Sequence, residues 1–168
     1  MIRRHALTLG LVLAGMTAAC GPDIDLTKAL DFKVTESGYF DDGIHDGKTR
    51  LLPTITFQIT NKSDASISSV VLLVTYHQDG ADGELDSVQA EGIGSAGLAP
   101  GASTAAAEVR CPHGYTLEGA RADFFTNSLY RDVVAKVFAR KRAGYMPLGA
   151  FKIDRRILEP TARTPGLQ

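Results

Sequence analysis

Two stretches of the 168-residue chain, YFDDGIHDG and HQDGADGELD, gather side chains that could bind a metal ion or exchange protons. The candidate side chains are Asp41, Asp42, His45 and Asp46 in the first stretch and Asp79, Asp82, Glu84 and Asp86 in the second. Several carboxylates in a glycine-containing loop can supply the oxygen ligands that Ca²⁺ requires. Neither stretch has the spacing of an EF-hand loop, and Asp-Gly is a common hairpin turn. We therefore expect a solvated turn at each place, with a calcium site as the alternative.

Cys111 and His113 are a second kind of candidate, because cysteine and histidine side chains bind zinc and act in nucleophilic catalysis. A structural zinc site needs four ligands, and no second pair stands at a usable spacing. The sequence has no Gly-x-Ser-x-Gly motif, and its four histidines are scattered. We therefore predict no catalytic residue, no metal ligand and no cofactor, and expect no enzyme activity. Cys111 is expected to pack as a small apolar side chain.

Cys20 stands in a different context, at the end of an N-terminal targeting signal. Arg3 and Arg4 form a basic start, and residues 6–16 form an apolar run too short to span a bilayer. The small residues 17–19 before Cys20 resemble the lipobox of bacterial lipoproteins, in which the cysteine is acylated and becomes the new N-terminus. This resemblance implies a signal peptide over residues 1–19 and a lipid anchor at Cys20. It also implies a cell-envelope location, on the periplasmic side of the outer or inner membrane.

Two alternatives for Cys20 stay open. Ordinary signal-peptide cleavage would leave its thiol unmodified, and that thiol could then form a disulfide with Cys111, because the envelope is oxidising. The residues that follow Cys20, GPDIDLTKA, are typical of a linker, and a disulfide would pin this linker to the domain. We therefore favour acylation and expect a tether over residues 20–30.

Composition and charge limit the classes of partner. Hydrophobic residues make up 44% of the chain, enough for one core in a domain of this length. The formal net charge is −1, without the basic clustering that phosphate backbones select, so we expect no nucleic-acid partner. The chain has no tryptophan, which disfavours sugar binding, although Tyr39, Phe40 and Tyr145 are expected in loops.

The segments that must position these residues have the sequence patterns of β-strands. Residues 54–61, TITFQITN, alternate between apolar and polar side chains, so Phe57 and its neighbours on one face are expected to be buried. Residues 67–77 are apolar on both faces and predict a central strand that includes Val74 and Tyr76. The polar stretch NKSDAS between the two predicts a hairpin-like turn. Further strands are expected at Phe32–Glu36, Thr104–Cys111, Ala120–Phe125, Val133–Arg140 and Leu148–Ile153.

About seven short strands separated by turn signals predict an all-β fold. We expect a single antiparallel two-sheet sandwich of the immunoglobulin or fibronectin type over residues 31–158, followed by a flexible tail over residues 159–168. A helix across residues 128–142 is the alternative to the strand expected at Val133–Arg140. The β-branched residues Val133 and Val137 favour the strand, because such side chains fit a pleated surface better than a helix.

The segment from Ile55 to Thr104 resembles bacterial FxLYD-type and related immunoglobulin-like envelope domains. The resemblance lies in the Asn-x-Ser turn, the following Ile-x-x-Val and aromatic strand, the acidic-glycine hairpin and the Pro-Gly turn of LAPGAS. It implies an exported binding or structural module without catalytic residues. We therefore expect a noncatalytic, membrane-tethered lipoprotein that binds or scaffolds an envelope protein. The alternatives are an exported domain that binds Ca²⁺ or a small ligand, and a hydrolase whose residues converge only in the fold.

Overall fold

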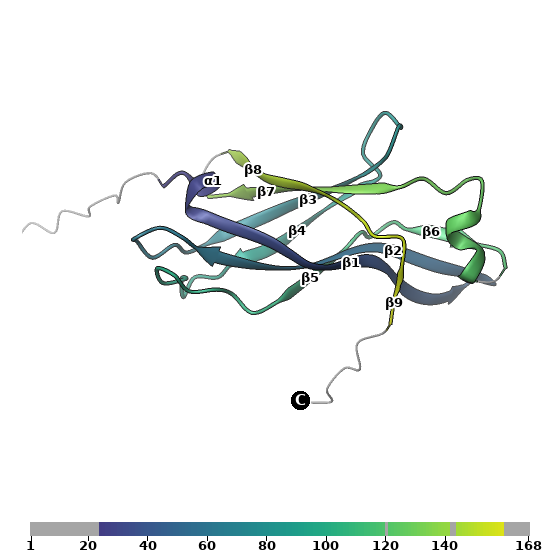
Figure 1. The fold of residues 1–168 in the computed structure, drawn as a ribbon, viewed down its shortest axis with the longest axis horizontal. Coiled ribbons are helices and arrows are strands. Elements are labelled where there is room, and N and C mark those ends of the chain that lie inside the picture. Colours follow the sequence, from purple (N-terminus) through teal and green to yellow (C-terminus); the bar gives the residue numbers. More distant parts are fainter. Residues whose placement is uncertain (1–23, 120, 142–143, 160–168) are drawn as a thin grey trace, which may run out of the picture.

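The computed structural model describes residues 24–119, 121–141 and 144–159, which form two β-sheets packed face to face (Figure 1). The elements in chain order are α1 (Leu26–Ala29), β1 (Leu30–His45), β2 (Lys48–Asn61), β3 (Val70–Gln78), β4 (Asp86–Ile93), β5 (Ala107–Arg110), β6 (Tyr115–Leu117), the 3₁₀ helix η1 (Arg121–Thr126), β7 (Val133–Arg140), β8 (Tyr145–Lys152) and β9 (Ile157–Leu158). The first sheet has the order β5-β2-β1-β9, with β6 also paired to β2, and the second has the order β4-β3-β7-β8. The described pairs are antiparallel except β1–β9. The predicted two-sheet sandwich is confirmed.

The hairpin of β1 and β2 is much longer than the sequence patterns predicted, with strands of 16 and 14 residues. Asp46 and Gly47 join the strands with φ angles of 51° and 77°, the left-handed pair that an Asp-Gly hairpin turn requires. The expected turn in YFDDGIHDG is therefore confirmed at Asp46–Gly47. The prediction that Tyr39, Phe40 and Tyr145 lie in loops is wrong. Tyr39 and Phe40 pair with β2 inside β1, and Tyr145 is the first residue of β8, opposite Arg140 of β7.

The polar stretch after β2 forms the predicted turn, but the turn does not close a hairpin. The Asn61 amide nitrogen donates hydrogen bonds to the carbonyl oxygens of Ala65 and Leu98, each at 2.8 Å, and its amide oxygen accepts from Ser63. The chain then passes to β3, which belongs to the other sheet. The hairpin-like connection was a wrong prediction, because local turn chemistry does not say which sheet receives the next strand.

Two further strand predictions have opposite outcomes. Residues 133–140 form strand β7 and no helix, as the β-branched residues indicated. Residues 121–126 form the 3₁₀ helix η1, so the strand predicted at residues 120–125 is wrong. Aromatic residues favour strands in general, but here Phe124 is buried in a cluster of aromatic rings that replaces strand pairing.

The core lies between the sheets, where Phe57 and Val74 are both buried as predicted. Phe57 stacks on Phe32 with ring centroids 4.9 Å apart. The packed domain begins before the expected boundary at residue 31, because Leu26 of α1 is fully buried. The Asp25 carboxylate accepts a hydrogen bond from the Thr27 N–H at 3.1 Å and so caps this four-residue helix. Helix α1 is therefore part of the domain and lies outside any linker.

The first sheet extends beyond the second at one end of the sandwich. At β8, the second sheet ends near Ser37, whose side-chain oxygen accepts a hydrogen bond from the Asp154 N–H at 3.3 Å. Strand β1 continues from there to His45, and η1 with residues 127–132 covers this overhang (Figure 1). We call residues 121–132 the clasp. The end of the molecule with the clasp is the distal end, and the end with α1 is the proximal end.

Candidate functional site

The first acidic stretch forms ion pairs at the distal end and no cluster of free carboxylates. Asp41 pairs with Arg121 of the clasp, and Asp42 lies 3.1 Å from the His45 imidazole and 3.4 Å from the Arg50 guanidinium. Asp41 and Asp42 therefore each have a cationic or imidazole partner, whereas the exposed Asp46 in the hairpin turn forms no ion pair with a described residue. Among the described residues, no group of three or more Asp, Glu, His or Cys side chains is arranged to hold a metal ion.

The second acidic stretch forms the loop between β3 and β4. Asp79, Asp82 and Glu84 are exposed there, and the loop borders a shallow hollow of about 610 Å³. Asp86, the last acidic residue of the stretch, accepts hydrogen bonds from the backbone and imidazole of His113. Three acidic residues of the stretch therefore lie in an exposed loop, and the fourth, Asp86, holds the turn that contains His113.

Cys111 and His113 lie close in the chain but do not form a reactive pair. Cys111 is fully buried, as expected, and burial raises the pKa of its thiol to about 12, so the thiol stays protonated at neutral pH. The His113 side chain is 78% exposed and turns toward Asp86. The pair offers no thiolate to a metal or substrate.

Cys20, the predicted lipidation site, lies outside the described residues. In the part of the chain that the structure describes, no helix has the length and apolar character needed to cross a membrane.

The clasp contributes three rings to the largest aromatic cluster seen in the described residues, which it forms with one residue of β1 and one of β6. Tyr39 of β1 lies at its centre, fully buried, with the rings of Phe124, Phe125, Tyr130 and Tyr115 at 5.1 to 6.2 Å between centroids. Most of these contacts are edge-to-face or tilted, which is the arrangement that the charge distribution of aromatic rings favours. The cluster seals the overhanging part of the first sheet.

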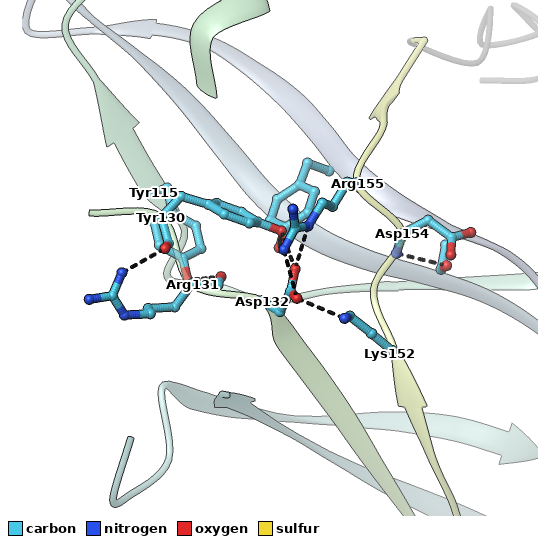
Figure 2. A network of polar contacts seen from close by, with 9 residues as sticks. Tyr115, Tyr130, Arg131, Asp132, Lys152, Asp154 and Arg155 are labelled. Atoms are coloured by element: carbon cyan, nitrogen blue, oxygen red, sulfur yellow. Dashed lines mark hydrogen bonds and ion pairs between the residues drawn. The ribbon is translucent and has the colours of Figure 1, made fainter. Parts of the chain in front are cut away.

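A polar network fastens the clasp to the second sheet (Figure 2). The Asp132 carboxylate accepts hydrogen bonds from Arg155 at 2.8 and 3.0 Å and from Tyr130 Oη at 3.1 Å, and the Lys152 ammonium lies 2.7 Å away. The Tyr130 and Tyr39 hydroxyls are 3.0 Å apart, which joins the network to the aromatic cluster. The network therefore connects β1, the clasp and the chain around the end of β8.

The protonation states of this network make it a fixed support. Hydrogen bonds from Arg155 and Lys152 hold the pKa of the Asp132 carboxyl well below its usual range. Burial is the main reason that the pKa of the Tyr39 hydroxyl lies far above its usual value. Asp132 is thus ionised and Tyr39 neutral at any physiological pH. These states suit a network that positions the clasp.

The distal end also displays apolar side chains to solvent. Four large hydrophobic or aromatic residues in the described ranges are exposed: Ile44 (71%), Leu129 (81%), Val71 (38%) and Tyr145 (44%). The two most exposed, Ile44 and Leu129, belong to the distal end. Val71 and Tyr145 lie at the opposite end of the second sheet, because both are opposite Arg140 of β7 in the strand register.

Leu117 of β6 links the positions of Ile44 and Leu129 at the distal end. Ile44 of β1 is opposite Thr49 of β2, which is opposite Leu117 of β6, so the three side chains share one face of the first sheet. Leu117 and Leu129 line the same small pocket of about 60 Å³, together with Phe124. We call Ile44, Leu117, Leu129 and this pocket the distal patch.

Sequence reasoning did not find the distal patch, since it placed a strand where the clasp lies. The run FFTNSLY contains the clasp aromatics and Leu129, and Asp46-Gly47 marks the hairpin that carries Ile44. These local signals indicate a turn and an apolar segment. They do not indicate that both segments lie at the same end of the sandwich.

No family model matches the chain, and the curated proteins contain no match. A solved structure described as the X-ray structure of Northeast Structural Genomics Consortium target SoR45 is similar in part. It has a TM-score of 0.46 and 10% sequence identity, covering 86% of this chain and 96% of that one.

Proposed function

We propose that the protein is a noncatalytic, lipid-anchored module of the cell envelope that binds another envelope protein through its distal end. The observation that supports this function best is the arrangement of the two ends. The chain enters the sandwich at α1, and η1 of the clasp lies at the opposite end (Figure 1). The two most exposed apolar residues belong to that distal end, Ile44 to the end of β1 and Leu129 to the clasp. An anchor at one end leaves the other end free to meet a partner.

The distance between anchor and domain supports a fixed orientation. Cys20 precedes the fully buried Leu26 by six positions. A chain of that length reaches at most about 20 Å even when fully extended. An acylated Cys20 would therefore hold the proximal end near the bilayer on its periplasmic face, in the inner or outer membrane, and point the distal patch away from it.

The exposed apolar residues are the reason to expect a protein partner. Apolar side chains exposed next to a pocket and surrounded by polar residues are typical of protein-binding surfaces. The clasp holds Leu129 on a segment that is fastened by Tyr130 and Asp132, so little conformational freedom would be lost on binding. A rigid surface of this kind suits binding by contact.

The lipid anchor is tested by the substitution Cys20→Ser. Each buried methylene contributes about 0.8 kcal/mol to membrane binding, so several acyl chains give a stable anchor where one is marginal. We expect the parent and a Cys111→Ala control to fractionate with membranes, and Cys20→Ser to lose membrane association. Identical fractionation of parent and Cys20→Ser would contradict the anchor.

Binding through the distal end is tested by photo-crosslinking in the cells that make the protein. A photoreactive amino acid is placed at position 44 or 129, and in matched controls at position 71 or 145, which are also exposed. We expect discrete crosslinked products of higher mass from positions 44 and 129 and none from the controls. Equal products from all four positions, or none at all, would contradict a distal binding surface.

A further inference from the structure

We infer that the distal patch binds a cationic, apolar segment of a protein: aliphatic or aromatic side chains flanked by lysine or arginine. This inference names the class of partner for the proposed function and rests on it. It follows from two properties of the distal end, the exposed apolar side chains and the sign of the charges around them.

The apolar part of the surface can take only a few side chains. Ile44 and Leu129 are the most exposed large apolar residues that the structure describes, and the pocket beside Leu129 has a volume of about 60 Å³. A cavity of this size accepts an aliphatic side chain or the edge of a ring. It does not enclose a drug-sized ligand, since such sites usually measure about 300 Å³ or more. An anchoring side chain of a peptide segment fits these dimensions.

The unpaired charges near the patch are mainly negative. Asp46 lies two residues from Ile44 in the hairpin turn, and Asp123 lies next to the pocket residue Phe124. Neither carboxylate forms an ion pair with a described residue, and both residues are exposed. The carboxylates of Asp79, Asp82 and Glu84 in the β3–β4 loop are also exposed and form no ion pair with a described residue. This loop lies beside the clasp, because the Asp79 N–H donates a hydrogen bond to the Asp132 carbonyl oxygen at 2.7 Å.

The cations of this end are mostly engaged with other carboxylates. Arg121 pairs with Asp41, and Lys48 pairs with Glu118 at 2.7 Å. Arg50 pairs with Asp42. Lys152 and Arg155 share the single carboxylate of Asp132, which leaves one excess positive charge against the five free carboxylates. Arg131 is the exception near the patch: its guanidinium donates to the backbone carbonyls of Ser128 and Tyr130. Lys136 borders the hollow below the β3–β4 loop.

The balance of free charges therefore attracts a positively charged partner. Opposite charges around an apolar contact raise the association rate and exclude partners of the wrong sign, and salt weakens both effects. A basic segment without apolar side chains would leave Ile44 and Leu129 uncovered, and an acidic apolar segment would be repelled by the surrounding carboxylates. A segment with both basic and apolar side chains would cover Ile44 and Leu129 and be attracted by the surrounding carboxylates.

Selection from a random 15-residue peptide library tests this inference. The full chain, purified from whichever cell fraction holds it, is immobilised and presented to the library. We expect the enriched peptides to combine lysine or arginine with aliphatic or aromatic residues. An Ile44→Ser, Leu129→Ser double variant should lose affinity for these peptides by about tenfold or more, because central apolar contacts dominate such interfaces. A Val71→Ser, Tyr145→Ser control should bind them unchanged.

The charge requirement is tested separately with the same enriched peptides. Asp46→Asn with Asp123→Asn should lower their affinity about three- to tenfold and reduce its dependence on salt. Circular dichroism confirms that each variant is folded, and all four substituted apolar sites are exposed.

Several outcomes would overturn the inference. They are no enrichment, enrichment of acidic or uncharged peptides, and peptides that bind the double variant as well as the parent. Dimerisation of the parent that is lost in the double variant would identify a second copy of the chain as the occupant and also overturn it. The fractionation and crosslinking experiments test the anchor and the distal binding surface of the proposed function. The peptide measurements use the purified chain, so their failure is distinguishable from a failure of those two experiments.

Discussion

The substitution Asp132→Asn tests whether the polar network fastens the clasp. It keeps the shape of the side chain and removes the charge that accepts hydrogen bonds from Arg155 at 2.8 and 3.0 Å and lies 2.7 Å from the Lys152 ammonium. The Asp132 side chain is only 10% exposed, whereas those of Arg155 and Lys152 are 57% and 60% exposed.

The expected loss follows from this difference in exposure. A hydrogen bond to a charged group contributes about 1.5–3 kcal/mol, and exposed ion pairs contribute about 1 kcal/mol or less. Since the two cations are screened by water, we expect Asp132→Asn to lower the free energy of unfolding by about 2 kcal/mol. For a chain of this size that corresponds to a fall in Tm of about 4–8 °C.

The pH dependence gives a second measurement of the same interaction. The pKa of the Asp132 carboxyl lies below its usual range in the folded protein because of Arg155 and Lys152, so its stabilising contribution is complete above its unfolded pKa of about 4. This contribution is lost as the pH falls through the folded-state pKa. The stability difference between parent and Asp132→Asn should thus be constant near neutral pH and shrink below about pH 4.

The matched control is Asp154→Asn. The Asp154 side chain is 63% exposed and lies 3.9 Å from the Arg156 guanidinium, so its removal should cost about 0.5 kcal/mol or less. Urea unfolding of the three proteins at several pH values measures both effects. Equal stability losses for Asp132→Asn and Asp154→Asn, or a difference that does not change with pH, would refute the role of the network.

Three further predictions concern the core and the loops. Phe57→Ala should lower the free energy of unfolding by about 3–5 kcal/mol, because Phe57 is 1% exposed and stacked on Phe32; an unchanged urea midpoint would place it outside the core. In Cys20→Ser, the Cys111 thiol should react with a thiol reagent only at the rate of unfolding, since burial raises its pKa to about 12. Fast labelling of the native protein would contradict this. Millimolar Ca²⁺ should leave the unfolding midpoint nearly unchanged, whereas a site at a hundredfold excess over Kd would add about 2.7 kcal/mol. A rise that disappears in an Asp82→Ala, Asp86→Ala double variant would reveal a calcium site.

Local patterns in the sequence predicted the elements whose burial alternates along a strand. Residues 54–61 and 133–140 are strands because a period of two places Phe57 and Val137 on a buried face, and tertiary context agrees with that pattern. Asp46-Gly47 closes a hairpin because these residue types accept positive φ at low cost. Cys111 is buried for the reason expected of a small apolar side chain.

The composition of two segments was misleading because their structure depends on distant partners. Tyr39 stands beside acidic residues and glycine, which suggests a loop, but pairing with β2 and cover by the clasp make it a fully buried strand residue. Residues 121–126 have the aromatic content of a strand and no neighbouring strand to pair with, so they form a 3₁₀ helix over the overhang.

The sequence by itself determined that the chain forms strands, where several of them turn, and which side chains avoid water, because these properties depend on residues a few positions apart. Only the tertiary structure decided that β2 and β3 belong to different sheets, that strand β1 continues beyond the end of β8, and that the segments carrying Ile44 and Leu129 lie at the end opposite α1. Sheet order depends on contacts between residues far apart in the chain. The free energy of those contacts comes from shared burial, to which no single segment contributes alone.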